Sequence, residues 1–449
     1  MQSRQSAQLA GMSTSHGIPT KARVEGKPSQ TQKEVLGLAF FWLTAFYFVY
    51  CARPADLIPA FGYLRPAKVT GALATLSLLL SLGKTPRQLK DLPKEAYYLL
   101  LIVVLLFISA LFSPVWKGGA FFTTLDFAKV YVIWILTFLL VTTFKRLKII
   151  IFLQSASVAA ISFLAIVKGH SVPRLQAVIG GFYSNPNDMA FAIVLSIPFC
   201  LAFLLSARSL VSKAAWCLGI MVMVAALMLT ASRAGFIDLI VSGAVMLWLY
   251  AVKGRRPYLI VGSIVLIAGL FIVSGKDLTV RFSGMVSAGN TAEQDTAYQS
   301  FEERKVLMSR AVDAIIHYPI LGVGAGDFVV YSEIWREVHA SYLQVAAEGG
   351  MAVLTLYLLF FATGFSNLRF LSKAGSLDQE TLVFVGALKS SLVGFVVGAC
   401  FAPEAYQFFP YFAVCYSSVL VAIVREQEPS PIAAAQLVMS PLRHSARAY

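Results

Sequence analysis

The chain has 449 residues, of which 58% are hydrophobic and only 13% are charged. Soluble domains carry charge on about a quarter of their residues, so this composition excludes an ordinary water-soluble protein and indicates one that is largely embedded in lipid. A net charge of +14 is compatible with nucleic-acid binding, but also with a membrane protein whose basic residues collect on one side.

The chain begins with a polar, basic tail at 1–34 that is rich in Ser and Gln and is predicted to be disordered. Apolar runs follow, each close to the ~20 residues that a helix needs to cross a membrane. We expect about twelve transmembrane helices, at 35–51, 67–82, 96–112, 127–144, 149–167, 188–206, 214–231, 235–252, 257–274, 341–365, 381–401 and 407–424.

The expected fold class is therefore all-α, a polytopic integral membrane protein. Helices one to nine occupy 35–274, one large periplasmic loop with short helices occupies 275–340, and the last three helices occupy 341–424. Residues 425–449 form a second polar tail.

Basic residues are unevenly divided between the two sides of this layout. With the first tail inside, the inner tails and loops hold 22 Lys and Arg residues, and the short outer loops hold seven. This is the positive-inside bias of membrane proteins, so the charge reflects orientation and gives no support for nucleic-acid binding. We expect a multi-pass protein of the bacterial inner membrane, with both termini cytoplasmic and the long loop periplasmic.

The sequence offers few ligands for metals or cofactors. Its five cysteines lie in or beside apolar segments without Cys-x-x-Cys spacing, which favours packing over a disulfide framework or a metal site. Asp-x-Asp pairs, His-x-x-x-His spacing and a Walker-type loop do not occur. Metal-assisted use of a nucleotide sugar therefore lacks its usual motifs, and we expect neither a metal nor a cofactor.

Residues 275–338 are the only long polar stretch between apolar segments. Within it, 298–317 has helical periodicity, with an apolar face made of Phe301, Met308, Ala311 and Ile315. Arg304 falls on that face, where an unpaired charge is costly. An ion pair with one of the loop's carboxylates and a site for an anion are both open interpretations.

Arg233 is the second unusual arginine. Residues 214–252 carry only two charges, Arg233 and Asp238, and are too long for one span. Ser232-Arg233-Ala234-Gly235 is typical of a tight outer turn, which places Arg233 at the membrane boundary. Arg233 would have only a structural role if its side chain extended to the membrane surface or paired with Asp238. Ionisable residues in such apolar settings are nevertheless functional candidates, and we favour function.

His339 stands where the long loop meets the next apolar segment. A histidine with the usual pKa of ~6.5 can accept a proton at neutral pH. A lone histidine at a helix start more often caps the helix or forms a structural hydrogen bond. His339 is a functional candidate only because Arg233 and Arg304 are candidates as well. Glu348 lies nearly opposite on the helix and is expected to pack against a neighbouring helix.

Two other motifs are predicted to be structural. The run Gly322-Val-Gly324-Ala-Gly326 lacks the third glycine position of the dinucleotide fingerprint, so we expect a turn whose bare backbone allows close approach. Asn185-Pro186 fits a helix start, with Asn185 as the cap and Pro186 as the first residue. A sugar contact by this motif is the alternative.

Together, three motifs resemble the O-antigen ligase family, which also includes lipid-linked glycan polymerases and some protein O-glycosylation ligases. They are Ser232-Arg233-Ala234-Gly235, the run from Pro319 to Phe328, and His339-Ala340-Ser341-Tyr342-Leu343-Gln344 with Glu348-Gly349. The resemblance is strongest over about 180–365.

The resemblance implies a donor and a mechanism. The donor would be a glycan on undecaprenyl pyrophosphate at the outer side of the membrane. His339 matches the family's proposed general base, which takes a proton from an acceptor hydroxyl in one inverting displacement. Arg233 and Arg304 match the arginines that hold the pyrophosphate, and Arg174 in another outer loop is a further candidate. Guanidinium groups bind phosphate oxygens bidentately and need no metal to do so.

The acceptor is left open by the sequence. It would be the lipid A core for a ligase and another carrier-linked glycan for an O-antigen or exopolysaccharide polymerase. Ala340, where many members have Asn, departs from the family pattern and weakens the choice of subfamily. An exporter of lipid-linked glycans is a third interpretation, but no clear repeat relates the two halves of the chain.

Overall fold

The computed structural model describes residues 30–58, 62–81, 85–168, 175, 183, 185–266, 268–269, 292–375 and 377–427. Every regular element in these ranges is a helix, which confirms the all-α expectation. The elements too short or too polar to span a membrane are α2 (Pro54–Leu57), η1 (Leu89–Asp91), α12 (Ala292–His317) and α13 (Phe328–Tyr331).

Nine of the described helices are long and apolar enough to cross a membrane. They are α5 (Lys94–Leu111), α6 (Lys117–Leu140), α7 (Phe144–Lys168), α8 (Pro186–Ser206), α9 (Leu210–Leu229), α10 (Arg233–Met246) with the π-helix η3 (Leu247–Lys253), α14 (Ser341–Lys373), α15 (Gln379–Gly398) and α16 (Phe408–Gln427). Two shorter apolar stretches match the first two predicted segments, Leu36–Ala52 within α1 (Gln30–Ala52) and the helix α4 (Pro66–Leu80). The predicted segment 257–274 lies only partly in the described ranges, so the total of about twelve stays a prediction.

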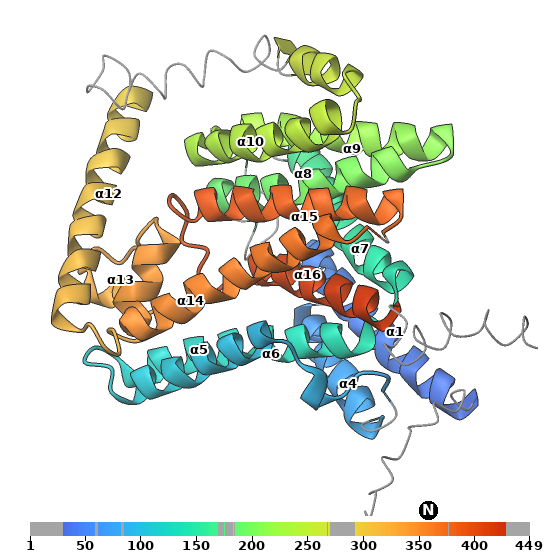
Figure 1. The fold of residues 1–449 in the computed structure, drawn as a ribbon. Coiled ribbons are helices and arrows are strands. Elements are labelled where there is room, and N and C mark those ends of the chain that lie inside the picture. The colour runs from blue at the N-terminus through green and yellow to red at the C-terminus, as the bar shows by residue number, and fades with distance from the viewer. Residues whose placement is uncertain are drawn as a thin grey trace, which may run out of the picture.

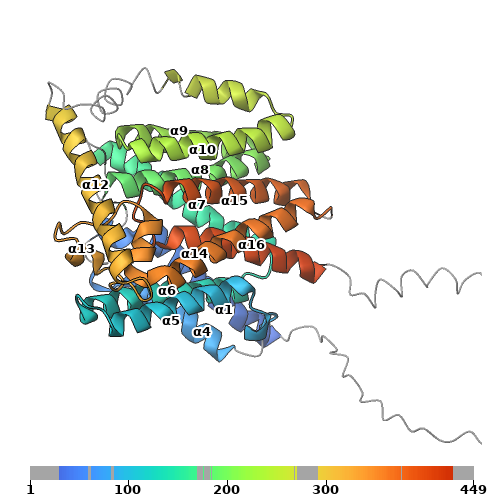
Figure 2. The same cartoon turned by 60° about the vertical axis from the view of Figure 1, so that its left-hand side comes forward.

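The long helices run side by side, and α12 lies across their ends (Figures 1 and 2). The start of α1 and the end of α16 lie at the other end of the bundle. We call the end covered by α12 the α12 face and the other end the opposite face. Because α8, α10, α14 and α16 all begin at the α12 face, the residues that precede these helices meet there.

The helices differ in how much of their surface is covered by protein. In their most apolar windows 83% of α16 and 72% of α8 are buried, but only 22% of α9. The centre of the bundle is therefore built around α8 and α16, and α9 lies at its rim. Large apolar side chains are exposed on the outside of the bundle, among them Phe41, Leu80, Leu111, Phe122 and Ile240. Soluble proteins rarely expose such surfaces, whereas lipid covers them at no cost.

The helix α14 is interrupted at Gly350, where φ is +77° and ψ is 178°. The glycine-rich turn at 322–326 lies directly on this break, because the amide of Gly324 donates to the Glu348 carbonyl at 3.0 Å. Gly322, Gly324 and Gly326 all have positive φ, which side chains other than glycine rarely tolerate. The close approach expected for this turn is therefore confirmed, and its partner is the backbone of α14.

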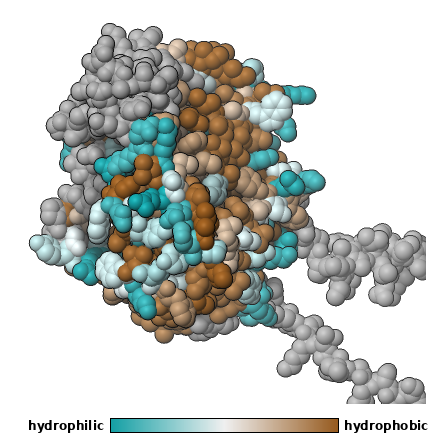
Figure 3. Space-filling view, turned by 90° about the vertical axis from the view of Figure 1, so that its left-hand side faces the viewer, coloured by the Kyte–Doolittle hydropathy of each residue, from teal (hydrophilic) through white to brown (hydrophobic). Residues whose placement is uncertain are grey.

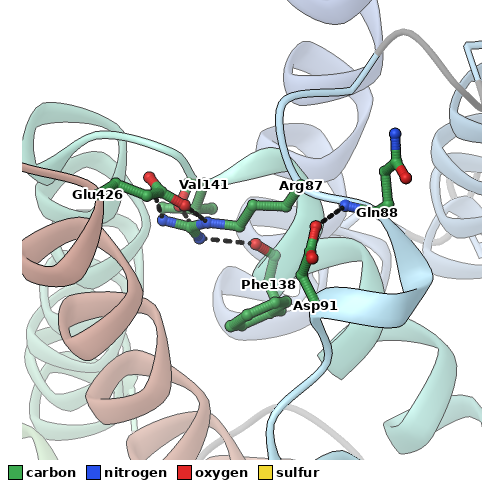
Figure 4. Close-up of polar contacts among 6 residues, drawn as sticks. All are labelled: Arg87, Gln88, Asp91, Phe138, Val141 and Glu426. Atoms are coloured by element: carbon green, nitrogen blue, oxygen red, sulfur yellow. Dashed lines mark hydrogen bonds and ion pairs between the residues drawn. The ribbon is translucent and has the colours of Figure 1, made fainter. Parts of the chain in front are cut away.

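On the opposite face, Arg87 joins three segments that are distant in the sequence (Figure 4). Its guanidinium donates to the carbonyl oxygens of Phe138 and Val141 at 2.8 and 2.9 Å and pairs with Glu426 at 2.6 Å. The Arg87 side chain is only 3% exposed. Since carbonyls at a helix end have no partner within the helix, Arg87 caps α6 and fastens it to the last turn of α16.

Candidate active site on the α12 face

His339 lies two residues before α14, at the centre of a tight turn. The amide of Ala340 donates to the Val338 carbonyl at 2.8 Å, which closes a three-residue turn around His339. Val338 and Ala340 are buried, whereas His339 is half-buried. The backbone is therefore fixed on both sides of an imidazole that keeps partial access to solvent. The predicted place of His339 at the start of the helix is right to within two residues.

Ser341 anchors this turn to the connection between α15 and α16. Its amide donates to the Ala399 carbonyl at 2.7 Å, and its hydroxyl donates to the Ala402 carbonyl at 2.6 Å. The same hydroxyl accepts from the Glu404 amide at 2.9 Å. Ser341 is fully buried, so water cannot replace these bonds. The position of His339 thus depends on the short 399–407 connection as well as on its own helix.

Arg304 lies on the buried side of α12, as predicted. The helix extends from Ala292 to His317 and packs through Leu307, Ala311 and Ala314, which are at most 1% exposed. Arg304 precedes Leu307 by three residues and therefore shares its face. The predicted composition of that face was wrong in one respect, because Met308 is 45% exposed. Apolar residues occupy two adjacent stripes of α12, and the sequence alone does not show which stripe packs against the rest of the protein.

The guanidinium of Arg304 has no ion pair with any carboxylate in the described part of the chain. Its Nε is buried and has no hydrogen-bond partner there. The adjacent carboxylate, Glu303, is instead paired with Arg336 at 2.6 Å. Burial lowers the pKa of Arg304, and the charge of Glu303 partly offsets this. Of the two interpretations of Arg304, the ion pair is not found among the described residues, and the anion site stays open.

Arg304 and His339 lie close enough for the charge of one to act on the other. Burial lowers the pKa of His339 to about 4, and the positive charges of Arg304 and Arg336 add to that effect. The imidazole is therefore neutral at neutral pH and has a nitrogen that can accept a proton. A neutral base thus lies close to a half-buried cation that has no carboxylate partner among the described residues.

Arg233 reaches the same face as the first residue of α10. Ser232 caps that helix, because its side chain accepts from the Gly235 amide at 3.2 Å. The Ser232 hydroxyl also donates to Asn187 Oδ1 at 2.9 Å, which ties α10 to the start of α8. At Gly235 a Cβ atom would lie 2.6 Å from the Ala190 Cβ, so only glycine allows the two helices to pack this closely. The tight turn expected at Ser232–Gly235 lies earlier, at Thr230 and Ala231, and Arg233, Ala234 and Gly235 are the first residues of α10.

The start of α8 follows the predicted pattern. Asn185 is the cap, its side chain accepting from the Asn187 amide at 2.9 Å, and Pro186 is the first helical residue. Asp188 follows in the first turn. The structural interpretation of this motif is therefore confirmed.

An acidic pair at this face was missed by the sequence reasoning. Glu404 is 1% exposed, and neither of its carboxyl oxygens has a hydrogen-bond donor among the described residues. Burial raises the pKa of Glu404 well above its usual value, and the charges of Asp188 and Glu337 raise it further. Burial and the nearby acidic groups therefore favour the protonated form of Glu404. One signal was available, since Glu404 is the only charged residue between 390 and 424.

The site lies on a surface of mixed character. Hydrophilic residues gather on the α12 face and alternate with hydrophobic patches (Figure 3). Among the described residues, no group of three or more His, Cys, Asp or Glu side chains is arranged to hold a metal ion. Arg174, the remaining candidate, lies outside the described residues.

One of three comparisons with known proteins matches the region that contains this site. Over residues 218–358 the chain matches the O-antigen ligase family. The matched region runs from α9 into α14 and contains Arg233, Arg304 and His339. The resemblance to the O-antigen ligase family is thus confirmed, and it supports a multi-pass membrane protein that acts as a glycosyltransferase of the O-antigen ligase or polymerase kind.

The other two comparisons add little. A chain from a solved structure described as "Structural coordination of polymerization and crosslinking by a peptidoglycan synthase complex" is similar, with a TM-score of 0.41 and 13% sequence identity over 75% of this chain and 98% of that one. The comparison with curated proteins found no match.

Proposed function

We propose that this O-antigen ligase-like chain moves a glycan from undecaprenyl pyrophosphate to an acceptor hydroxyl at the α12 face, which is periplasmic. The observation that carries the proposal is the juxtaposition of Arg304 and His339. A half-buried guanidinium without a carboxylate partner among the described residues lies close to an imidazole that is neutral at neutral pH. These two groups supply what a metal-free glycosyl transfer requires, a base and a cation for the leaving group.

His339 acts as the general base in this proposal. One ring nitrogen takes the proton of the acceptor hydroxyl as its oxygen attacks the anomeric carbon from the side opposite the pyrophosphate. The bond between the anomeric carbon and the phosphate oxygen breaks, and undecaprenyl pyrophosphate leaves with the electron pair. The configuration at the anomeric carbon is inverted. A pKa of about 4 makes the free imidazole a weak base. A bound pyrophosphate would offset the charges of Arg304 and Arg336 and raise that pKa when a base is needed.

Arg304 holds the pyrophosphate through the transfer. Its guanidinium is already partly desolvated. It therefore stabilises the negative charge that develops on the leaving group more strongly than a fully hydrated cation would. Arg233 is proposed to bind the same diphosphate from α10, and its place at the first turn of the helix adds the positive end of the helix dipole. Arg174 is proposed as a further contact.

The opposite half of the bundle argues against an exporter. Arg87 joins α6 to α16 there, and a second buried cluster joins α5, α14 and α16. In that cluster the Glu95 carboxylate accepts from Asn367 and from the Ser418 hydroxyl. A path for a lipid-linked glycan between these helices would break both clusters and leave buried polar groups without partners. An enzyme whose site lies on the α12 face needs no such path.

The central test is the transfer of a radiolabelled glycan from synthetic lipid-linked donor by purified protein in lipid nanodiscs. His339→Ala is expected to lower turnover roughly 100-fold or more while donor binding is retained. Arg304→Gln is expected to weaken donor binding as well. The matched controls are His317→Ala and Arg310→Gln, because both residues lie on α12 and are exposed. Full turnover by His339→Ala would refute the role of base.

The acceptor separates the ligase from the polymerase. In a deletion strain, loss of a ligase should leave long glycans on the carrier lipid, whereas loss of a polymerase should leave single repeats that are still transferred onward. Profiling the glycolipids of that strain by gel electrophoresis and mass spectrometry distinguishes the two outcomes. Accumulation of donor on the cytoplasmic side would instead indicate an exporter.

A further inference from the structure

A second group of basic residues lies on the opposite face, between the end of η3 and the first half of α15. A cavity of about 160 Å³ opens there. Its polar lining residues are Tyr250, Arg256, Ser372, Gln379 and Lys389, and the others are Leu, Val and Gly. The lining contains two cations and no carboxylate.

Lys389 is unusual because it lies within an apolar helix. It is ten residues beyond Gln379, the first residue of α15, which corresponds to a rise of about 15 Å. Lys389 is exposed while its neighbours Leu388 and Ser390 are buried, so its side chain leaves the helix on the lipid side. Side chains of an α-helix tilt towards its N-terminal end, and Lys389 lines the same cavity as Gln379, the first residue of α15.

Arg256 approaches the same cavity from the end of the π-helix. The wider turn of η3 carries Tyr250 onto α15, where its hydroxyl donates to the Val383 carbonyl at 2.6 Å. Gly386 makes room for this contact, because a Cβ atom there would lie 2.9 Å from the Tyr250 hydroxyl. The Arg256 amide then donates to the Ala251 carbonyl at 2.9 Å, which turns the chain back over the cavity. π-Helical turns of this kind are frequent at functional sites.

Neither cation is neutralised by a carboxylate among the described residues. Lys389 and Arg256 form no ion pair within the described part of the chain. Two cations that share a small cavity repel each other, and the one on the lipid side also loses hydration. An anion between them would relieve both costs. Basic pockets between transmembrane helices on the cytoplasmic side are known to bind acidic lipid head groups.

We propose that this cavity binds the phosphate group of an anionic phospholipid. Arg256 and Lys389 pair with the phosphate oxygens, Gln379 donates to the remaining polar groups of the head, and the acyl chains lie along the apolar surface of α15. A soluble phosphate could reach Arg256 but would have to leave water to approach Lys389. A phospholipid already has its chains in the bilayer. The proposal is independent of glycan transfer at the α12 face.

The test is lipid retention by the intact protein. Protein from nanodiscs of equal parts phosphatidylglycerol and phosphatidylcholine is analysed by native mass spectrometry, for the wild type, Arg256→Gln, Lys389→Gln and the double variant. Each lost cation is expected to weaken phosphatidylglycerol binding roughly five-fold. Lys213→Gln is the matched control, since Lys213 is an exposed lysine near the start of α9 at the same end of the bundle. It should retain the lipid like the wild type.

Three results would overturn the proposal. The first is that the double variant retains phosphatidylglycerol as well as the wild type does. The second is that the wild type retains phosphatidylcholine as well as phosphatidylglycerol. The third is that millimolar inorganic phosphate displaces the lipid. Lys389→Arg keeps the positive charge and is expected to restore binding, which separates loss of the site from loss of the fold. Size-exclusion chromatography of each variant checks the fold directly.

Discussion

The amide of Glu404 donates to the hydroxyl of Ser341 at 2.9 Å, so the α15–α16 connection is tied to the first residue of α14. The same hydroxyl donates to the Ala402 carbonyl at 2.6 Å. Ser341→Ala removes both bonds and leaves two buried backbone groups without partners, which costs roughly 1–3 kcal/mol. We expect a lower melting temperature and a fall in kcat larger than the change in KM, because His339 loses its anchor two residues away.

Thr355→Ala is the control for that change. The Thr355 hydroxyl bonds only to the Met351 carbonyl of its own helix and is exposed. Thermal shift assays and steady-state transfer kinetics on both variants provide the measurement. Equal kinetics for Ser341→Ala and the wild type would show that the connection does not position His339.

The pH dependence of transfer should report the environment of His339. Burial, Arg304 and Arg336 lower its pKa to about 4. The base is then unprotonated down to about pH 5, so kcat/KM should stay level through neutral pH and fall only in more acidic solution. Arg336→Gln removes one of the positive charges. The pKa of His339 should therefore rise, and the acidic limb of the profile should move to higher pH.

Arg310→Gln serves as the comparison for Arg336→Gln. Arg310 lies on α12 and pairs with Glu333 at 3.4 Å, but it does not contribute to the pKa of His339. Its pH profile should coincide with that of the wild type. An acidic limb that does not move in Arg336→Gln would contradict the electrostatic link.

Glu404→Gln is predicted to stabilise the protein increasingly as the pH rises. A carboxyl whose pKa is raised by folding contributes stability below its unfolded pKa of about 4.5 and loses it as the pH rises towards the folded pKa. The amide removes this dependence, with a slope of at most about 1.4 kcal/mol per pH unit. Melting temperatures between about pH 5 and 8 provide the check. Glu333→Gln is the control, because the Glu333 side chain is 76% exposed.

Gly350→Ala should be among the most damaging glycine substitutions. At this position φ is +77°, and an added Cβ would lie 2.1 Å from the Ile320 carbonyl oxygen. We expect a loss of more than about 2 kcal/mol and a shift of the glycine-rich turn, because α14 could no longer break there. At Gly243, in α10, nothing lies within 4 Å of an added Cβ. Gly243→Ala should be neutral or mildly stabilising, and thermal shift assays compare the two.

Arg87→Ala should unfold the protein at lower temperature without changing the chemistry at the α12 face. The guanidinium satisfies two carbonyl oxygens and Glu426 in a site where Arg87 is 3% exposed. Its removal should cost roughly 3 kcal/mol. Lys148→Ala breaks a more exposed pair with Glu380, at 2.8 Å, and should cost less than about 1 kcal/mol. If Arg87→Ala changed KM for the donor while stability was kept, the two ends of the bundle would be coupled.

The sequence by itself determined the class of this protein and most of its helices. Hydrophobic length alone predicts which segments span the membrane, because a helix must satisfy its backbone before it enters lipid. Local chemistry also predicted the cap of α8, because Asn185 is followed by Pro186, a residue suited to the first position of a helix. The motifs around Arg233 and His339, with the run from Pro319 to Phe328, were sufficient to indicate a resemblance to the O-antigen ligase family.

Only the tertiary structure decided which charges act on one another. Glu404 is 65 residues from His339 along the chain and joins the site through Ser341, a contact that no local pattern encodes. The break at Gly350 and the partner of the glycine-rich turn also depend on segments that meet only in the fold. The pKa of a side chain follows from its burial and its neighbours, and both are properties of packing in three dimensions.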